Sequence, residues 1–256
     1  MQKKGVVIFD FGSQYTQLIA RRVRELNVYS EILSSNTHLS QIIERDPSAI
    51  ILSGGPSSVF GGEAPSFDKK IFDIDIPILG ICYGLQLLAH HHGGLVESNG
   101  QGEYGFAEIE IDDDKKLFQN VSKSSQVWMS HMDRVTKLPD GWHTLAHSSN
   151  GVIAAMANKN QTRVATQFHP EVAHSKEGKN ILKNFLFNIS NCSANWTAEN
   201  IVEQKVKLIR EKVGESNILV GVSGGVDSTV VAALIHKAVG PQCNAVLIDH
   251  GLLRKD

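Results

Sequence analysis

Short apolar runs rich in Val and Ile alternate with helically periodic segments along the first part of the chain. Buried strands are predicted at residues 5–10, 49–52 and 76–81. Ser13 is expected to cap a helix after the first strand, because the following apolar residues recur every three or four positions. A second helix is expected at residues 85–92. Strands alternating with helices are typical of a parallel sheet covered by helices on both faces.

From residue 107 onward the pattern changes to short strands separated by turns. Strands are predicted at residues 107–111, 127–130, 144–147, 152–157 and 163–168. An amphipathic helix is predicted at residues 176–189. The fold class is therefore α/β, with an open, mostly parallel sheet flanked by helices.

A polar segment without periodicity, residues 191–195, is expected to be a linker. After it come a helix (201–213), a strand (218–222), a helix (228–239) and a strand (245–248). We predict two domains, residues 1–194 and 195–256. Two parallel strands cannot bury their faces well, so the second α/β domain is expected to be incomplete.

Composition and charge disfavour several classes of function and location. Twenty-five basic and twenty-seven acidic side chains give a net charge of −2, which favours neither a nucleic-acid partner nor a membrane surface. No apolar run is long enough for a signal sequence or a membrane span. Three widely spaced cysteines form no disulfide framework, so we expect a cytoplasmic protein.

Cys82 follows a predicted strand and precedes a predicted helix, between Gly80 and Gly84. This arrangement is typical of a nucleophile elbow, in which a sharp turn lifts the sulfur to the helix N-terminus. Helix N–H groups there favour the thiolate, which is a strong nucleophile near neutral pH. The alternative is a buried structural cysteine.

The segment Phe168-His169-Pro170-Glu171 supplies a base and an orienting carboxylate for this thiol. In extended backbone His169 and Glu171 point the same way, so they can act with Cys82 as a catalytic triad. The loop Ser53-Gly54-Gly55-Pro56 follows another strand. We assign the oxyanion hole to the N–H groups of Gly55 and Tyr83, although a simple glycine turn remains an alternative.

The glycine-flanked cysteine, Ser-Gly-Gly-Pro and His-Pro-Glu, in this order, resemble the class I glutamine amidotransferases over residues 5–190. The resemblance implies glutamine as substrate, a γ-glutamyl thioester on Cys82, and release of ammonia. It also places Gln86 at the bound glutamine, and it matches Ser130, His131 and Asp133 to a further glutamine-binding segment. Met132 stands where comparable members carry Gly, which can alter the backbone of that loop.

A second anion-binding motif, Ser223-Gly224-Gly225-Val226-Asp227-Ser228, lies between a predicted strand and helix. Small residues let successive N–H groups wrap a phosphate at a helix N-terminus, and Asp227 can hold Mg²⁺ that bridges the phosphates. The motif resembles the pyrophosphate loop of N-type ATP pyrophosphatases and implies ATP as substrate. Asp249 can contact the nucleotide or be an ordinary strand-end acid.

The two modules in this order resemble the enzymes that convert xanthosine monophosphate (XMP) to GMP. This implies that the second domain adenylylates XMP, that ammonia displaces AMP, and that the complete protein is a homodimer. A regulatory module without turnover and an amidotransferase serving another acceptor are the competing readings. Three further features are not expected to take part in the chemistry. We interpret His90–His91–His92 as a helix end and Asp112–Asp113–Asp114 as a turn, and we expect Cys192 and Cys243 to be unreactive thiols.

Overall fold

The computed structural model describes residues 5–60, 62, 64–98, 102–247 and 251. The chain folds into two compact units, Met1–Ala194 and Asn195–Asp256.

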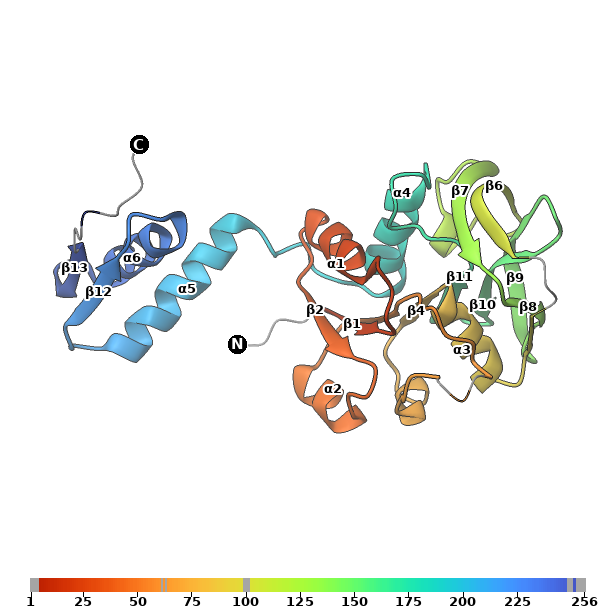
Figure 1. Cartoon of the computed structure of the whole chain (residues 1–256), viewed down its shortest axis with the longest axis horizontal. Helices are drawn as coiled ribbons and strands as arrows, with labels where there is room; N and C mark the ends of the chain where they lie inside the picture. Colours follow the sequence, from red (N-terminus) through yellow and green to blue (C-terminus); the bar gives the residue numbers. More distant parts are fainter. Residues whose placement is uncertain (1–4, 61, 63, 99–101, 248–250, 252–256) are drawn as a thin grey trace. The chain divides into compact units, whose positions relative to one another are not determined.

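The first unit is built on one open sheet, which has nine strands among the described residues (Figure 1). Its strand order is β2-β1-β3-β4-β11-β10-β9-β6-β7. The pairs from β2 to β11 are parallel, and the pairs from β11 to β7 are antiparallel. The strands are β1 (Val6–Asp10), β2 (Ser30–Ser34), β3 (Ala49–Leu52), β4 (Ile78–Ile81), β6 (Glu103–Ile111), β7 (Ser124–His131), β9 (Trp142–Ser148), β10 (Ile153–Asn158) and β11 (Arg163–Thr166).

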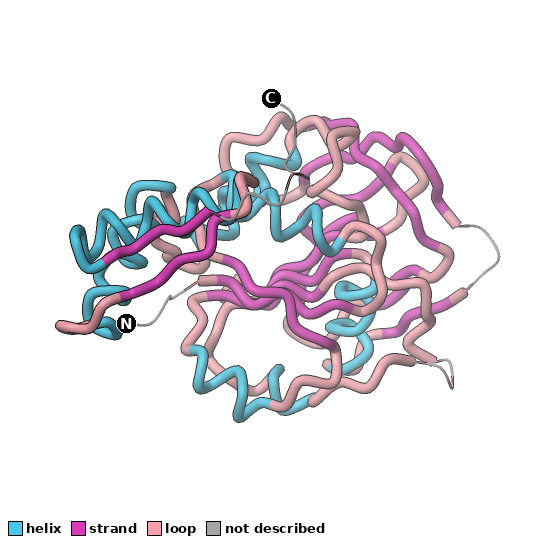
Figure 2. The backbone as a smooth tube through the Cα atoms, turned by 60° about the vertical axis from the view of Figure 1, so that its left-hand side comes forward, coloured by secondary structure: helices cyan, strands magenta, loops and turns pink. Residues whose placement is uncertain are grey.

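Helices cover both faces of this sheet (Figure 2). Alternate side chains of β1 enter opposite cores, because Ile8 faces one cluster and Phe9 the other. On the Ile8 side lie α1 (Thr16–Glu25) and α4 (Gly178–Asn184). On the other side lie α2 (Leu39–Arg45) and α3 (Tyr83–His91). Both faces are therefore buried, as the continuous apolar strand sequences require.

The predicted α/β class, with a helix-flanked open sheet, is confirmed, but several local predictions need correction. Ser13 is not the N-cap of α1, since that position is Tyr15, whose N–H donates to Ser13 Oγ at 3.1 Å. The helix after Cys82 begins at Tyr83 rather than at residue 85. The predicted helix 176–189 is α4 followed by a π-helical turn, Phe185–Ile189.

Four elements were not predicted from the sequence. They are the edge strand β2, the helix α2, and a small antiparallel pair, β5 (Leu95–Glu97) with β8 (Arg134–Lys137). All are short or half-exposed, so they carry little hydrophobic periodicity. Short 3₁₀ turns at Lys69–Phe72 and Lys116–Phe118 complete the unit.

The second unit contains α5 (Ala198–Val213), β12 (Ile218–Val222), α6 (Val226–Val239), the 3₁₀ turn Gly240–Gln242 and β13 (Cys243–Leu247). The two strands pair in parallel. Its core is small and centres on Val206, Ala238 and Val239. Several large apolar side chains are exposed, among them Leu219 (74%) and Val226 (79%).

None of the helices in the described part of the chain combines the length and apolar character needed to cross a bilayer.

Candidate active site

Cys82 occupies a strained turn between β4 and α3. Its backbone has φ 53° and ψ −101°, a conformation that a residue with a side chain rarely adopts. Close backbone contacts explain the two flanking glycines. A Cβ atom on Gly80 would lie 2.5 Å from the Gly84 carbonyl oxygen, and one on Gly84 would lie 2.5 Å from the Leu52 carbonyl oxygen. The expected elbow geometry is thus present.

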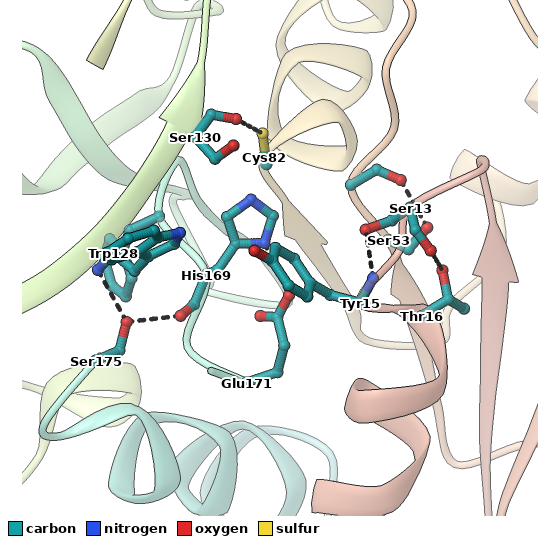
Figure 3. A network of polar contacts seen from close by, with 12 residues as sticks. Ser13, Tyr15, Thr16, Ser53, Cys82, Trp128, Ser130, His169, Glu171 and Ser175 are labelled. Atoms are coloured by element: carbon teal, nitrogen blue, oxygen red, sulfur yellow. Dashed lines mark hydrogen bonds and ion pairs between the residues drawn. The ribbon is translucent and has the colours of Figure 1, made fainter. Parts of the chain in front are cut away.

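The sequence-predicted base and carboxylate lie beside this cysteine, with the His169 ring between Cys82 and Glu171 (Figure 3). His169 Nδ1 lies 2.7 Å from Glu171 Oε1, and both side chains are buried. The Cys82 side chain also acts on the imidazole, because it raises the pKa of His169. The three predicted triad residues therefore lie together.

The main chain of His169 is held by β7 and by the loop that precedes α4. Its N–H donates to the Trp128 carbonyl at 3.0 Å, and its carbonyl accepts a 2.6 Å hydrogen bond from Ser175 Oγ. Ser175 Oγ also accepts from the Trp128 N–H at 3.1 Å. The Tyr15 ring packs edge-on against the imidazole, with ring centroids 5.1 Å apart (Figure 3). These contacts fix the imidazole before substrate binds.

Burial alone would lower the pKa of His169, but its charged partners outweigh that effect. The Glu171 carboxylate and the Cys82 sulfur raise the pKa of His169 from 6.5 to about 10. The imidazole is therefore protonated at neutral pH, beside the sulfur. A protonated base next to a thiolate can donate its proton to a departing amine.

Cys82 and His169 open into a cavity of about 570 Å³. Its volume lies within the usual range for small-molecule sites. Glu171 and Tyr83 do not line it. The other predicted glutamine-site residues do, together with Tyr15 and Tyr104: Gly55, Gln86, Ser130, His131 and Asp133.

The glycine loop after β3 approaches the triad closely. A Cβ atom on Gly54 would lie 3.1 Å from His169 Cε1 and 3.7 Å from Cys82 Cβ. One on Gly55 would lie 2.6 Å from the Phe11 carbonyl oxygen. Tyr83 is the first residue of α3, so its N–H has no acceptor within the helix. Both predicted oxyanion donors thus belong to backbone beside Cys82, and their role stays a prediction.

The predicted glutamine loop is tied to α3 by its own hydrogen bonds. The Asp133 carbonyl accepts from Gln86 Nε2 at 2.8 Å and lies 3.0 Å from His131 Nδ1. His131 Nε2 faces Glu103 at 3.2 Å, and burial lowers the pKa of His131 although Glu103 opposes the shift. Met132 adopts no left-handed backbone, so it needs no glycine there. The direct contacts of these side chains with glutamine stay predictions.

The sequence did not predict the roles of Tyr15, Glu103 and Ser175 at this site. Tyr15 and Glu103 lie far along the chain from the residues that they contact, and no local motif indicates any of the three. Glu103 is the clearest case, because its carboxylate joins His131 to Ser148 Oγ at 3.0 Å and to Asn150 Nδ2 at 2.8 Å. Only the pairing of β6 with β7 and β9 brings these groups together.

Cys192 is buried, and burial raises the pKa of its thiol to about 12. A thiol of that kind is unreactive at neutral pH, in line with the expectation from the sequence.

In the second unit, the predicted phosphate loop connects β12 to α6. Gly224 has φ +79°, and Gly225 is the N-cap of α6. Ser228 Oγ donates to the Gly225 carbonyl and accepts from the Ser223 N–H at 3.2 Å. Asp227 lies exposed in the first turn of the helix. The loop is therefore an open turn at a helix N-terminus, while Asp249 lies outside the described residues.

The part of the chain that the structure describes contains no cluster of three or more His, Cys, Asp or Glu side chains able to hold a metal ion. A single exposed carboxylate fits only a cation whose remaining ligands are phosphate oxygens and water, as Mg²⁺ commonly has.

The sequence matches the family described as glutamine amidotransferase class-I over residues 7–189. The chain belongs to the class I glutamine amidotransferases. Residues 198–252 of this amidotransferase match a second family, described as NAD synthase, and that match spans the loop Ser223–Ser228.

Among curated proteins, the amidotransferase is 51% identical over 251 residues to a GMP synthase (glutamine-hydrolysing) of Brachyspira hyodysenteriae, covering 98% of this chain and 49% of the relative. It is 51% identical over 254 residues to the enzyme of the same name in Campylobacter jejuni, with 99% and 50% coverage. The chain thus spans about half the length of these relatives. The crystal structure of a candidate GMP synthase subunit from Thermoplasma acidophilum superposes with a TM-score of 0.64 at 30% identity, covering 72% of this chain and 93% of that one.

We expect the His169–Glu171 pair to make the stability of the amidotransferase depend on pH. The pKa of His169 is raised from 6.5 to about 10 on folding, so the folded state binds this proton more tightly. Its stabilising contribution is fully present below pH 6.5 and is lost as the pH rises through about 10. Denaturant unfolding of the wild type and of His169→Gln between pH 6 and pH 10 measures this contribution. The difference between the two proteins should shrink as the pH rises, and a constant difference would contradict the assignment.

Proposed function

We propose that the first unit hydrolyses glutamine to glutamate and ammonia, with Cys82, His169 and Glu171 as its triad. The observation that carries this proposal is the close, buried arrangement of the three side chains, with Cys82 and His169 lining a cavity of substrate size. The sharp turn at Cys82 requires Gly80 and Gly84, and this turn supports the assignment of Cys82 as the nucleophile.

In the proposed mechanism the Cys82 sulfur attacks the side-chain amide carbon of glutamine. The N–H groups of Gly55 and Tyr83 stabilise the oxyanion that forms. His169 gives its proton to the amide nitrogen, ammonia leaves, and a γ-glutamyl thioester remains on Cys82. His169 then takes a proton from water, and the resulting hydroxide releases glutamate and regenerates the thiolate. Glu171 keeps Nδ1 of His169 bonded throughout, which fixes the orientation of the imidazole.

For the complete protein we propose the activity of a glutamine-hydrolysing GMP synthase. The support is the roughly 50% identity to enzymes of that name over nearly the whole chain, together with the order of the two modules. ATP would adenylylate XMP at the second domain, with release of pyrophosphate, and ammonia would displace AMP to give GMP. The backbone of Ser223–Ser228 would hold the ATP phosphates, and Asp227 would hold Mg²⁺, which neutralises phosphate charge when bound. We place the enzyme in the cytoplasm as a homodimer.

One assay tests both levels of this proposal. Glutamate release from glutamine is measured on this chain and on a longer one, with and without ATP and XMP. Glutamate release by this chain supports the glutaminase, and its stimulation by XMP with ATP in the longer chain supports the acceptor. A different nucleotide that stimulates while XMP does not would favour an amidotransferase serving another acceptor. Absence of glutamate release in both chains would favour a regulatory module.

We expect Asp227→Asn in the complete protein to abolish magnesium-dependent adenylylation and leave the glutaminase intact. Asp227 is the carboxylate within a loop that otherwise attracts anions, and Asn cannot supply its negative charge to a cation. Release of AMP from ATP in the presence of XMP is the measurement. Labelling of Cys82 by an electrophilic glutamine analogue serves as the control and should be unchanged. Normal AMP release by the variant would refute the metal role.

A further inference from the structure

Gln167 lies against the sulfur of Cys82 but does not belong to the lining of the cavity. Its Nε2 is 3.7 Å from Cys82 Sγ, and its side chain is fully buried. Gln167 does not line the cavity, whereas Cys82 and His169 do. An amide therefore contacts the reacting atom without lining the cavity.

Strand register explains how residues 85 positions apart come together. β4 and β11 pair in parallel with Ile81 opposite Thr166, and the Cys82 N–H donates to the Thr166 carbonyl at 2.8 Å. Cys82 and Gln167 directly follow the last residues of these two neighbouring strands. The Gln167 N–H donates to the Ala154 carbonyl at 2.8 Å, so the main chain of Gln167 is held by β10.

Gln167 belongs to the same short segment as the triad residues His169 and Glu171. The strand β11 ends at Thr166, and the backbone from 167 to 171 bends and turns rather than continuing as an extended strand. His169 and Glu171 form the base and its orienting group, and Gln167 precedes His169 by two residues. One segment therefore supplies both the base and the amide that contacts the sulfur.

The surroundings of the sulfur show what this amide can do. The Ser130 carbonyl oxygen lies 3.6 Å from Cys82 Sγ, where it can accept from a thiol but repels a thiolate. Gln167 Nε2 offers an N–H, which favours the negative charge. The titratable group beside the sulfur is His169, whose pKa is raised by both Glu171 and Cys82.

The carbonyl oxygen of the Gln167 side chain is expected to lower the stability of the fold. Gln167 Oε1 is buried and has no hydrogen-bond partner within the described part of the chain. A buried, unsatisfied carbonyl oxygen is unfavourable, and an apolar side chain of similar shape would remove that cost. An amide in this position is therefore poorly explained by packing alone.

We propose that Gln167 is a catalytic residue of the glutaminase, whose side-chain N–H donates a hydrogen bond to the Cys82 sulfur. The bond stabilises and orients the thiolate before attack on the amide carbon. It stabilises the sulfur again when water displaces it from the thioester and the sulfur takes back the bonding electron pair. No proton passes through Gln167. This inference rests on the proposed role of Cys82 as the nucleophile.

The test compares Gln167→Met and Gln167→Glu with the wild type. Methionine keeps the length of the side chain without an N–H, and an ionised glutamate adds a charge that repels the thiolate. Loss of a hydrogen bond to a charged group is expected to lower kcat by roughly 10- to 100-fold. Because Gln167 does not line the cavity, KM for glutamine should stay within about twofold. Alkylation of Cys82 by iodoacetamide without glutamine should slow by a similar factor as kcat.

Two readouts separate this role from a structural one. The thermal midpoint of Gln167→Met should equal or exceed that of the wild type, since the unsatisfied oxygen is gone. Gln126→Met is the matched control, because Gln126 lies in β7 and donates to the His174 carbonyl, away from the cavity. It should leave kcat and the alkylation rate unchanged.

The outcomes also separate this inference from the proposed function. If Cys82→Ala retains glutaminase activity, the proposed nucleophile is wrong. If Cys82→Ala is inactive but both Gln167 variants keep wild-type kcat and alkylation rates, only the role of Gln167 is wrong. Faster alkylation in Gln167→Met would mean that the side chain accepts from a thiol, and unfolding of both variants would mean a structural role. Either result would overturn the inference.

Discussion

Cys82→Ala is expected to lower the rate of glutamine hydrolysis by about 10⁴- to 10⁶-fold. The reason is structural as well as chemical. Cys82 follows β4 in a conformation with positive φ and lines the cavity together with His169. Among the cysteines, Cys192 is buried with a raised pKa, and Cys243 belongs to the second unit. Neither can replace Cys82 as the carrier of the acyl group.

Glutamate release in the purified variant measures this effect, and labelling by an electrophilic glutamine analogue locates the nucleophile. The analogue should modify Cys82 in the wild type and nothing in Cys82→Ala. Cys243→Ala is the control and should hydrolyse glutamine like the wild type. In the complete protein, free ammonia should still support GMP formation by Cys82→Ala, because only the supply of ammonia is lost. Labelling of Cys192 or Cys243 in the wild type would remove Cys82 from the mechanism.

The sequence predicted those residues of the site whose roles are indicated by their neighbours in the chain. The strand before Cys82 is continuously apolar. Gly80 and Gly84 are needed at this strand-to-helix turn because a Cβ atom at either position would collide with neighbouring backbone. His169 and Glu171 are two residues apart, so their closeness in the chain is enough to bring them together, although the backbone at 170–171 is a turn rather than the expected extended segment. In each case the information lies within a few residues.

The sequence did not predict contacts that depend on strand register. Gln167 reaches Cys82 only because β11 lies beside β4 with Thr166 opposite Ile81. Glu103 reaches His131 only because β6 pairs with β7. Nothing near either residue in the chain indicates its partner, since register depends on the packing of the whole sheet.

The unpredicted elements have a related cause. β2 is an edge strand whose side chains are mostly half-buried, and α2 is a seven-residue helix in which Ile42 is the buried residue. A single buried side chain gives no period to detect. These elements form because the neighbouring strand β1 and the core beside it are already in place.

The 256-residue chain by itself is expected to form no GMP from XMP, even when ammonia is supplied. Open α/β sheets bind nucleotides in a crevice beyond several strand ends, and the described part of the second unit has two strands. Leu219, Val246 and Leu247 on these strands are 74%, 43% and 54% exposed. Apolar faces of this kind are normally covered by further strands or helices, which would also complete the acceptor site.

The first unit, by contrast, has a sheet covered on both faces and contains all three triad residues. We therefore expect glutaminase activity in the same preparation that forms no GMP. The measurement incubates the chain with ATP, magnesium, XMP and ammonia, and a longer chain that includes the remaining length of the relatives serves as the positive control. GMP formed at a rate proportional to the concentration of the 256-residue chain would show that two strands are enough for adenylylation. That result would require the loop Ser223–Ser228 and the exposed faces beside it to bind both nucleotides without further protein.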